Sequence, residues 1–121
     1  MVILLVEDEP FFRSAVKRLL RKEGFHVIES ENGVDAYKIV REIGRSIDLV
    51  LTDYQMPRMD GFELAQLVTQ LYPDMPVLLM TGYASSLKTS LAGYAVLSKP
   101  FRHHDLVQAI RKQIVTAAVS N

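Results

Sequence analysis

Several apolar runs of this chain end in a polar residue of a kind that could act on a phosphoryl group. In chain order these residues are Glu7 and Asp8, Asp53, Thr81 and Lys99. A carboxylate can attack a phosphorus atom in line, a hydroxyl can donate a hydrogen bond to a phosphoryl oxygen, and an ammonium group neutralises charge on the equatorial oxygens. Asp53 follows the apolar run 49–51 after a single threonine, and it is the natural nucleophile of this set.

Carboxylates gathered in one crevice repel one another, and the repulsion raises carboxyl pKa values unless a cation lies between them. Lys99 supplies one fixed positive charge, and a hard divalent ion such as Mg²⁺ accepts carboxylate, carbonyl and water oxygens. The chain has no cysteine and no paired histidines near these acids, so zinc is a poor fit. The residues therefore predict Mg²⁺-assisted phosphoryl transfer to Asp53.

These side chains can meet only if the apolar runs before them are neighbouring strands. Strands are predicted at about 2–6, 25–29, 49–51, 76–80 and 94–97. The third and fourth runs are apolar throughout, which is typical of strands buried on both faces of a parallel sheet. The carboxyl ends of parallel strands meet at one edge, where the ligand crevice of an open α/β sheet lies.

Helices are predicted between the strands from apolar residues at helical spacing. They run from Pro10 to about Gly24, from Asn32-Gly33 to Gly44, from about Gly61 to Pro73, weakly over 85–91, and from about His104 onward. The spacing turns Ile43 and Leu71 inward, and the tail 116–121 carries no further pattern. Strands alternating with helices predict a doubly wound parallel α/β sheet with helices on both faces.

The bulk composition restricts the classes of partner. With 121 residues and 49% hydrophobic residues, the chain can fill the core of one domain. Fourteen Lys and Arg balance fourteen Asp and Glu, so there is no overall basic field for direct nucleic-acid or membrane binding. The absence of cysteine and a first apolar run too short for a signal or membrane segment lead us to expect a cytoplasmic protein.

Four motifs at the strand ends resemble those of the receiver domain of two-component response regulators. They are 6–10 (Val-Glu-Asp-Glu-Pro), 53–57 (Asp-Tyr-Gln-Met-Pro), 81–83 (Thr-Gly-Tyr) and 97–101 (Leu-Ser-Lys-Pro-Phe). The resemblance implies a flavodoxin-like receiver fold with five parallel strands in the order 2-1-3-4-5. It implies one receiver domain over 1–121, with its core at about 2–115.

The resemblance also implies roles for individual residues. Asp53 would take a phosphoryl group from a sensor histidine kinase or a histidine phosphotransfer protein. Asp8, Asp53 and the main-chain carbonyl of Gln55 would ligate Mg²⁺, with Glu7 acting mostly through water. Thr81 would bind a phosphoryl oxygen and Lys99 would pair with the phosphoryl group, with the Lys99-Pro100 peptide bond cis as in the family.

Two features depart from the family pattern. The strand-five aromatic residue that swings inward on activation is replaced by Val96, and Lys99 follows Thr81 by only eighteen positions, which predicts a shortened fourth helix. We therefore expect a reduced face around helix four, strand five and helix five, and a monomer or weak dimer that acts by phosphoryl relay or through another surface. Tyr83 and Gln55 flank the path of the hydrolytic water, and Tyr83 is a candidate shield for the acyl phosphate.

Two other functions fit the same class of fold. A phosphohydrolase with an aspartyl nucleophile needs a second Asp two residues later, where this chain has Gln55; we expect no enzyme activity on outside substrates. A flavin-binding module needs a loop after the first strand that binds the phosphate of the flavin, and the three acidic residues 7–9 would repel that phosphate. A yellow colour on purification would reopen that interpretation. His103 and His104, adjacent on a helix, are expected in solvated or capping roles.

Overall fold

The computed structural model describes residues 1–82 and 93–120 and contains one parallel five-stranded sheet. The strands are β1 (Val2–Val6), β2 (His26–Ser30), β3 (Leu49–Asp53), β4 (Val77–Thr81) and β5 (Ala95–Ser98). Their spatial order is β2-β1-β3-β4-β5, and every pairing is parallel. The predicted doubly wound fold and its strand order are thus confirmed. The predicted fourth helix at 85–91, and with it the shortening, lies outside the described residues.

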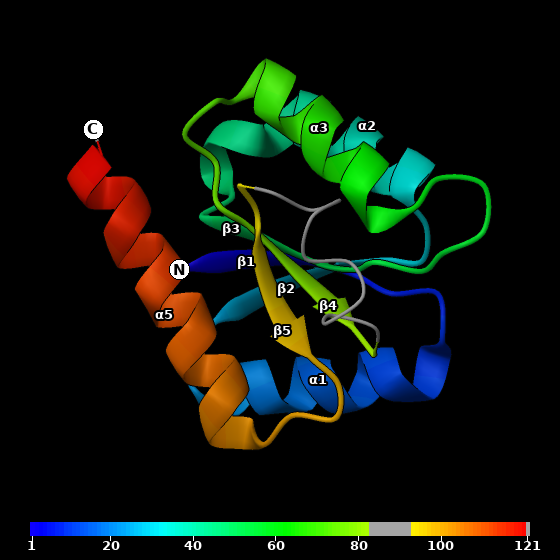
Figure 1. Ribbon diagram of the computed structural model, residues 1–121, viewed down its shortest axis with the longest axis vertical. Coiled ribbons are helices and arrows are strands. Elements are labelled where there is room, and N and C mark those ends of the chain that lie inside the picture. The colour runs from blue at the N-terminus through cyan, green and yellow to red at the C-terminus, as the bar shows by residue number, and fades with distance from the viewer. Residues whose placement is uncertain (83–92, 121) are drawn as a thin grey trace.

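Helices cover both faces of the sheet (Figure 1). They are α1 (Pro10–Lys22), α2 (Gly33–Ile43), α3 (Gly61–Leu71) and α5 (His103–Ser120), with a 3₁₀ turn η1 (Gly44–Ser46) after α2. Alternate residues of the central strands face opposite layers: Ile3 and Leu5 pack with α1 and α5, whereas Leu4 and Val6 pack with α2 and α3. This double burial explains why β3 and β4 contain no exposed residue.

Local sequence signals fix where the helices begin. The Glu9 carboxylate accepts hydrogen bonds from the amides of Phe11 and Phe12, and Pro10 occupies the first turn of α1. Asp60 and Glu63 form a reciprocal capping box at the start of α3. The cap of α1 lies directly after the acidic residues at the end of β1, and the cap of α3 ends the loop that follows Asp53.

The last helix was predicted too short. We expected no pattern in 116–121, yet α5 continues to Ser120. Residues 117 and 118 are both alanine, which has the highest helix propensity, and the Thr116 hydroxyl donates a hydrogen bond to the Lys112 carbonyl. Two predicted core positions are also wrong, because Ile43 and Leu71, in the last turns of their helices, are 40% exposed.

One glycine is required by close packing beneath the acidic edge. The Gly61 amide donates to the Tyr54 carbonyl at 2.8 Å, which draws the start of α3 against the end of β3. A Cβ at this position would overlap the main-chain carbonyl oxygen of Asp53 and lie 3.0 Å from Leu79 Cδ2 and from Tyr54 Cα. Gly61 thus allows the helix to approach the strand that carries Asp53.

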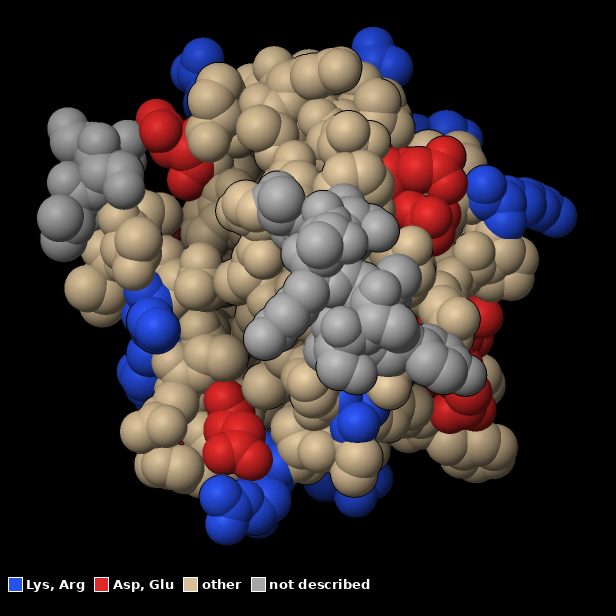
Figure 2. Space-filling view, viewed as in Figure 1, with Lys and Arg blue, Asp and Glu red and all other residues tan. Residues whose placement is uncertain are grey.

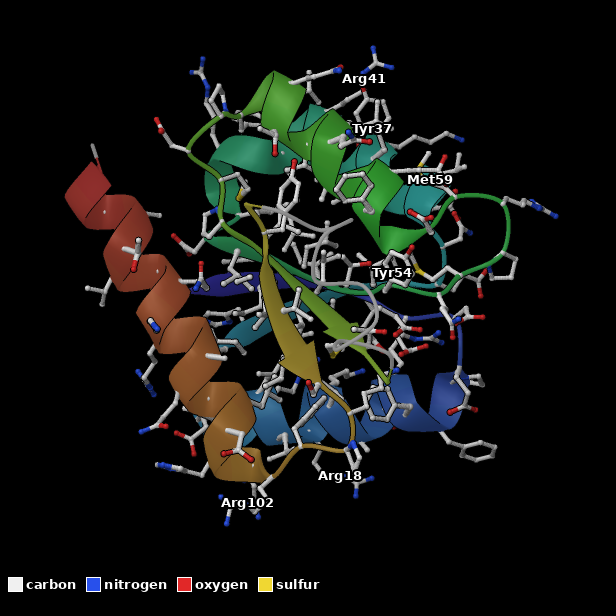
Figure 3. All side chains as sticks on the ribbon, viewed as in Figure 1. Arg18, Tyr37, Arg41, Tyr54, Met59 and Arg102 are labelled. Atoms are coloured by element: carbon white, nitrogen blue, oxygen red, sulfur yellow. The ribbon has the colours of Figure 1, made fainter. Side chains whose placement is uncertain are left out.

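The surface shows mixed charge. On the face in Figure 2, acidic and basic side chains form small separate groups around the rim of the molecule rather than one field. Figure 3 shows Arg18 and Arg102 projecting away from the sheet. None of the helices in the described part of the chain is long and apolar enough to cross a membrane.

Candidate functional site

Strand register brings the predicted site residues to one edge of the sheet. Val6 of β1 pairs with Thr52 of β3, so Glu7 comes level with Asp53. Asp53 pairs with Met80 of β4, and Thr81 pairs with Ser98 of β5, the residue before Lys99. The polar residues at or just after the ends of β1, β3, β4 and β5 therefore lie within one register position of the polar residue on the adjacent strand. The sequence predicted that they would share one edge of the sheet.

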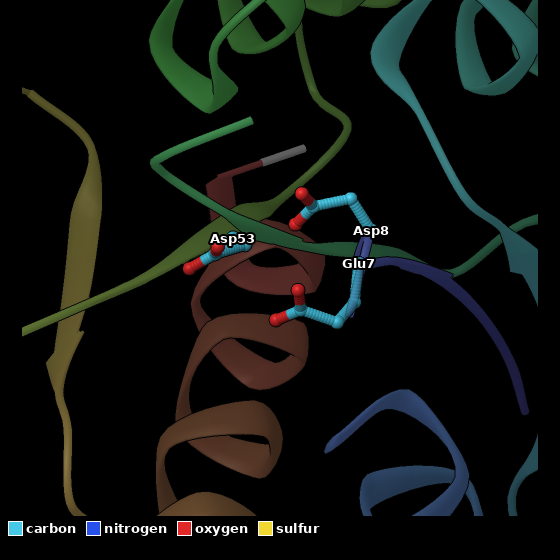
Figure 4. Close-up of side chains that lie close together, drawn as sticks. All are labelled: Glu7, Asp8 and Asp53. Atoms are coloured by element: carbon cyan, nitrogen blue, oxygen red, sulfur yellow. The ribbon is translucent and has the colours of Figure 1, made fainter. Parts of the chain in front are cut away.

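Three carboxylates converge at this edge. Glu7, Asp8 and Asp53 each place a carboxylate oxygen within 4.8 Å of the others, and Figure 4 shows the side chains directed toward a common region from the ends of β1 and β3. Glu7 is 1% and Asp53 7% exposed, whereas Asp8 is exposed. An all-oxygen donor set that is partly open to solvent suits a hard cation such as Mg²⁺, which keeps several of its waters.

Lys99, which directly follows the edge strand β5, reaches into the acidic group. Its Nζ donates to Asp53 Oδ1 at 2.8 Å and lies 3.5 Å from Glu7 Oε1. The Lys99 amide donates to the Thr81 carbonyl at 2.8 Å, which ties the lysine to the residue at the end of β4. Thr81 is 2% exposed. The Lys99-Pro100 peptide bond is cis, as predicted from the resemblance.

Burial is the main influence on the pKa values of the two inner acids, Glu7 and Asp53. The pKa of Glu7 is raised to about 7, chiefly by burial; the Glu9 amide, 3.0 Å from Glu7 Oε2, and Lys99 oppose the shift, and the charge of Asp53 adds to it. Burial likewise raises the pKa of Asp53, and the hydrogen bond from Lys99 is the largest opposing effect. Because both neighbouring acids disfavour the charged form, a bound cation would stabilise their ionised carboxylates.

We expect this burial to give the metal-free protein a distinctive pH dependence. Glu7 holds its proton to about pH 7 in the folded state but releases it near pH 4.5 when unfolded. The folded state then binds more protons in this window, so the free energy of unfolding falls as the pH rises through it, by about 2–3 kcal/mol. Urea unfolding in EDTA near pH 5 and near pH 8 measures the loss.

Glu7→Gln should abolish most of this fall in the free energy of unfolding between pH 5 and pH 8. Glu42→Gln, on the exposed face of α2, should leave it unchanged. Equal stability of the wild-type protein at both pH values would contradict the assignment of the raised pKa to Glu7.

Sequence reasoning missed two residues of α1 that contact this edge. Arg13 Nη1 donates to the Glu7 carbonyl at 2.7 Å, and Arg13 Nε lies 3.5 Å from Glu29 Oε1 at the end of β2. The Phe12 ring lies against the Lys99 ammonium, with 4.4 Å between Nζ and the ring centroid. Helical spacing in the sequence puts Phe12 with the apolar face of α1 and Arg13 on the other side, and it gives no sign of which group either side chain contacts.

Other predicted residues lie as follows. Gln55 is exposed in the loop after β3, and its role as a carbonyl ligand stays a prediction. Val96 is half-buried in the edge strand β5. His103 pairs with Glu23 at 2.9 Å, in keeping with a surface role. Tyr83 lies outside the described residues.

A family model of the response regulator receiver domain matches residues 3–111. The chain is 39% identical over 119 residues to the response regulator receiver protein CpdR of Brucella abortus, covering 95% of this chain and 98% of CpdR. It is also 34% identical over 116 residues to the sensor kinase CckA of the same organism, of which it covers only 12%. The chain belongs to the response regulator receiver domain family of two-component systems.

Solved structures agree with this assignment. The receiver domain of the hybrid histidine kinase CckA matches with a TM-score of 0.82 and 33% identity, covering 94% of this chain and 99% of that one. The receiver domain of the sensor histidine kinase PA1611 from Pseudomonas aeruginosa matches with a TM-score of 0.85 and 25% identity, covering 94% and 97% of the two chains. The PA1611 domain holds a magnesium ion in its active-site cleft.

Proposed function

We propose that Asp53 is the phosphoacceptor of a Mg²⁺-dependent receiver domain fed by a sensor histidine kinase or a histidine phosphotransfer protein. The observation that carries the proposal is the convergence of Glu7, Asp8, Asp53 and Lys99 at one sheet edge, with Lys99 Nζ 2.8 Å from Asp53 Oδ1. Membership of the receiver family supports the same chemistry.

In the proposed reaction an Asp53 oxygen attacks the phosphorus atom of a phosphohistidine. The new P–O bond forms as the P–N bond breaks, and the electron pair stays on the imidazole nitrogen, which leaves as a neutral group once protonated. Lys99 moves from the carboxylate oxygen to a phosphoryl oxygen, and Thr81 donates a hydrogen bond to another. A bound Mg²⁺, held by Asp8, Asp53 and the Gln55 carbonyl with Glu7 acting through water, would neutralise the added charge.

Labelling with acetyl phosphate tests this proposal without any knowledge of the kinase. The protein should gain the mass of one phosphoryl group in Mg²⁺ and none in EDTA, and reduction with borohydride should locate the acyl phosphate at Asp53. Label on another residue, or equal labelling in EDTA, would overturn the proposal. An absence of turnover on p-nitrophenyl phosphate would distinguish the receiver from an aspartyl phosphohydrolase. We disfavour the phosphohydrolase because Gln55 occupies the position of its second Asp and an amide cannot act as a general acid or base.

Arg13 gives a prediction about metal affinity. Arg13→Met removes the donor to the Glu7 carbonyl and loosens the turn that presents Glu7 and Asp8. We expect the dissociation constant for Mg²⁺, measured by isothermal titration calorimetry, to rise about three- to tenfold, which corresponds to the loss of about one hydrogen bond. Arg18→Met, on the exposed face of the same helix, is the matched control, and equal weakening in both variants would refute the role.

We further propose that the domain lies in the cytoplasm and is a monomer or weak dimer. It would signal by relaying the phosphoryl group, or through a surface other than the face around β5. Val96 offers no aromatic ring to report the state of Asp53. Size-exclusion chromatography with scattering should show little change of mass when beryllofluoride is added with Mg²⁺. Strong dimerisation on activation would exclude this mode of output.

A further inference from the structure

The ammonium group of Lys99 lies among three partners, and one of them is not a charge. Asp53 Oδ1 is 2.8 Å and Glu7 Oε1 3.5 Å from Nζ, and the centroid of the Phe12 ring is 4.4 Å away. The Lys99 side chain is 28% exposed. The Phe12 ring therefore covers one side of the ammonium group with an aromatic face.

Phe12 is held in this position by a second aromatic residue. The Phe101 ring, two residues after Lys99, packs on Phe12 edge-on, with 6.0 Å between centroids and 65° between planes. Phe12 also packs against the buried core beneath α1, whereas its neighbour Phe11 is 83% exposed. An aromatic pair at this spacing is mutually attractive and restricts the rotation of both rings.

We propose that Phe12 is a positioning residue that fixes the Lys99 ammonium for phosphoryl capture. This inference rests on the proposed function of Asp53. A cation over an aromatic face is attracted by the ring quadrupole, and the attraction strengthens where water is excluded. The Lys99 ammonium can then exchange a carboxylate oxygen for a phosphoryl oxygen while it stays against the Phe12 ring. Fewer neighbouring groups must therefore move when the phosphoryl group arrives.

A fluorination series at position 12 separates this role from packing. Fluorinated phenylalanines, introduced by stop-codon suppression, weaken the ring quadrupole stepwise while nearly keeping the size and shape of the ring, and the melting temperature of each variant reports any loss of packing on Phe101. We expect the rate of labelling by acetyl phosphate in Mg²⁺ to fall with each added fluorine, by about three- to tenfold over the series. The same series at Phe11, on the same helix but 83% exposed, should leave the rate unchanged.

A rate that is flat across the Phe12 series, with melting temperatures also unchanged, would overturn the inference. So would an equal decline in the Phe11 series, since that would reflect fluorination of the helix rather than contact with Lys99. Phe12→Leu extends the comparison by removing the ring, and the fluorinated variants keep the test decisive if the leucine variant does not fold.

A measurement without phosphate distinguishes failure of this inference from failure of the proposed function. Proton resonances of the methylene group next to Lys99 Nζ should be shifted upfield by the Phe12 ring, lose the shift in Phe12→Leu and keep it in Phe11→Leu. If the wild-type protein shows the shift but accepts no phosphoryl group, the proposed function fails and the positioning role falls with it. If it accepts the phosphoryl group at a rate that is flat across the Phe12 series, or shows no ring shift, only the Phe12 inference fails.

Discussion

Asp53→Asn is expected to reduce labelling by acetyl phosphate to background, at least about a hundredfold below the wild-type protein. The amide keeps the shape of the side chain but lacks a nucleophilic oxygen anion. Glu7 and Asp8 follow β1, the strand beside β3, so we expect neither carboxylate to take the position of Asp53. Intact-protein mass spectrometry after a fixed exposure in Mg²⁺ measures the loss.

The same substitution should stabilise the metal-free fold near neutral pH. The pKa of Asp53 is raised chiefly by burial, which means that the folded protein disfavours its charged form. We expect a higher melting temperature in EDTA, together with a smaller gain from added Mg²⁺ than in the wild-type protein. Asp74→Asn, on the exposed turn before β4, is the control for both measurements. Full labelling of Asp53→Asn, or a lower melting temperature, would contradict the assigned role and the burial argument respectively.

Gly61→Ala should destabilise the protein by about 2–3 kcal/mol and slow phosphorylation at the same time. The added methyl group overlaps the Asp53 carbonyl, so either α3 or the end of β3 must move, and overpacking of this kind costs more than the helix propensity of alanine returns. For a chain of this length, the melting temperature should fall by about 10 °C. Thermal unfolding and the acetyl phosphate assay report the two effects.

Gly82→Ala is the matched control, because no atom of the described residues lies within 4 Å of a Cβ built there. It should shift stability by less than about 1 kcal/mol. Equal melting temperatures for Gly61→Ala and the wild-type protein would show that α3 can retreat from β3 without cost.

The sequence predicted the sheet and its acidic edge because both depend on short-range patterns. A fully apolar run such as 49–51 can be satisfied only by burial on both faces, and the next polar residue must then emerge at the strand end. Parallel strands have their carboxyl ends at one edge of the sheet, which is why Glu7, Asp53 and Lys99 could be predicted to lie at the same edge. The strand order came from the family resemblance rather than from the residues.

What the sequence could not give was the direction of individual side chains on α1. Whether Arg13 contacts Glu29 alone or also the Glu7 carbonyl depends on the rotation of the helix and on side-chain rotamers. The same holds for Phe12 beside Lys99. The extent of α5 was missed for another reason: residues 114–119 are apolar except for Thr116, so no polar face contrasts with an apolar one, and the helix propensity of residues 117 and 118 is the main sign that the helix continues.

Lys99 directly follows β5, and this position affects how the site can lose its cation. β5 is an edge strand of four residues, paired within the described sheet with β4 alone, whereas Asp53 ends a central strand with no exposed residue. Local opening of β5 would withdraw the cation and leave the acids in place, at a free-energy cost below that of global unfolding. Amide hydrogen exchange should therefore be faster at 95–99 than at 49–53, and the protein should spend a measurable fraction of its folded time unable to capture a phosphoryl group.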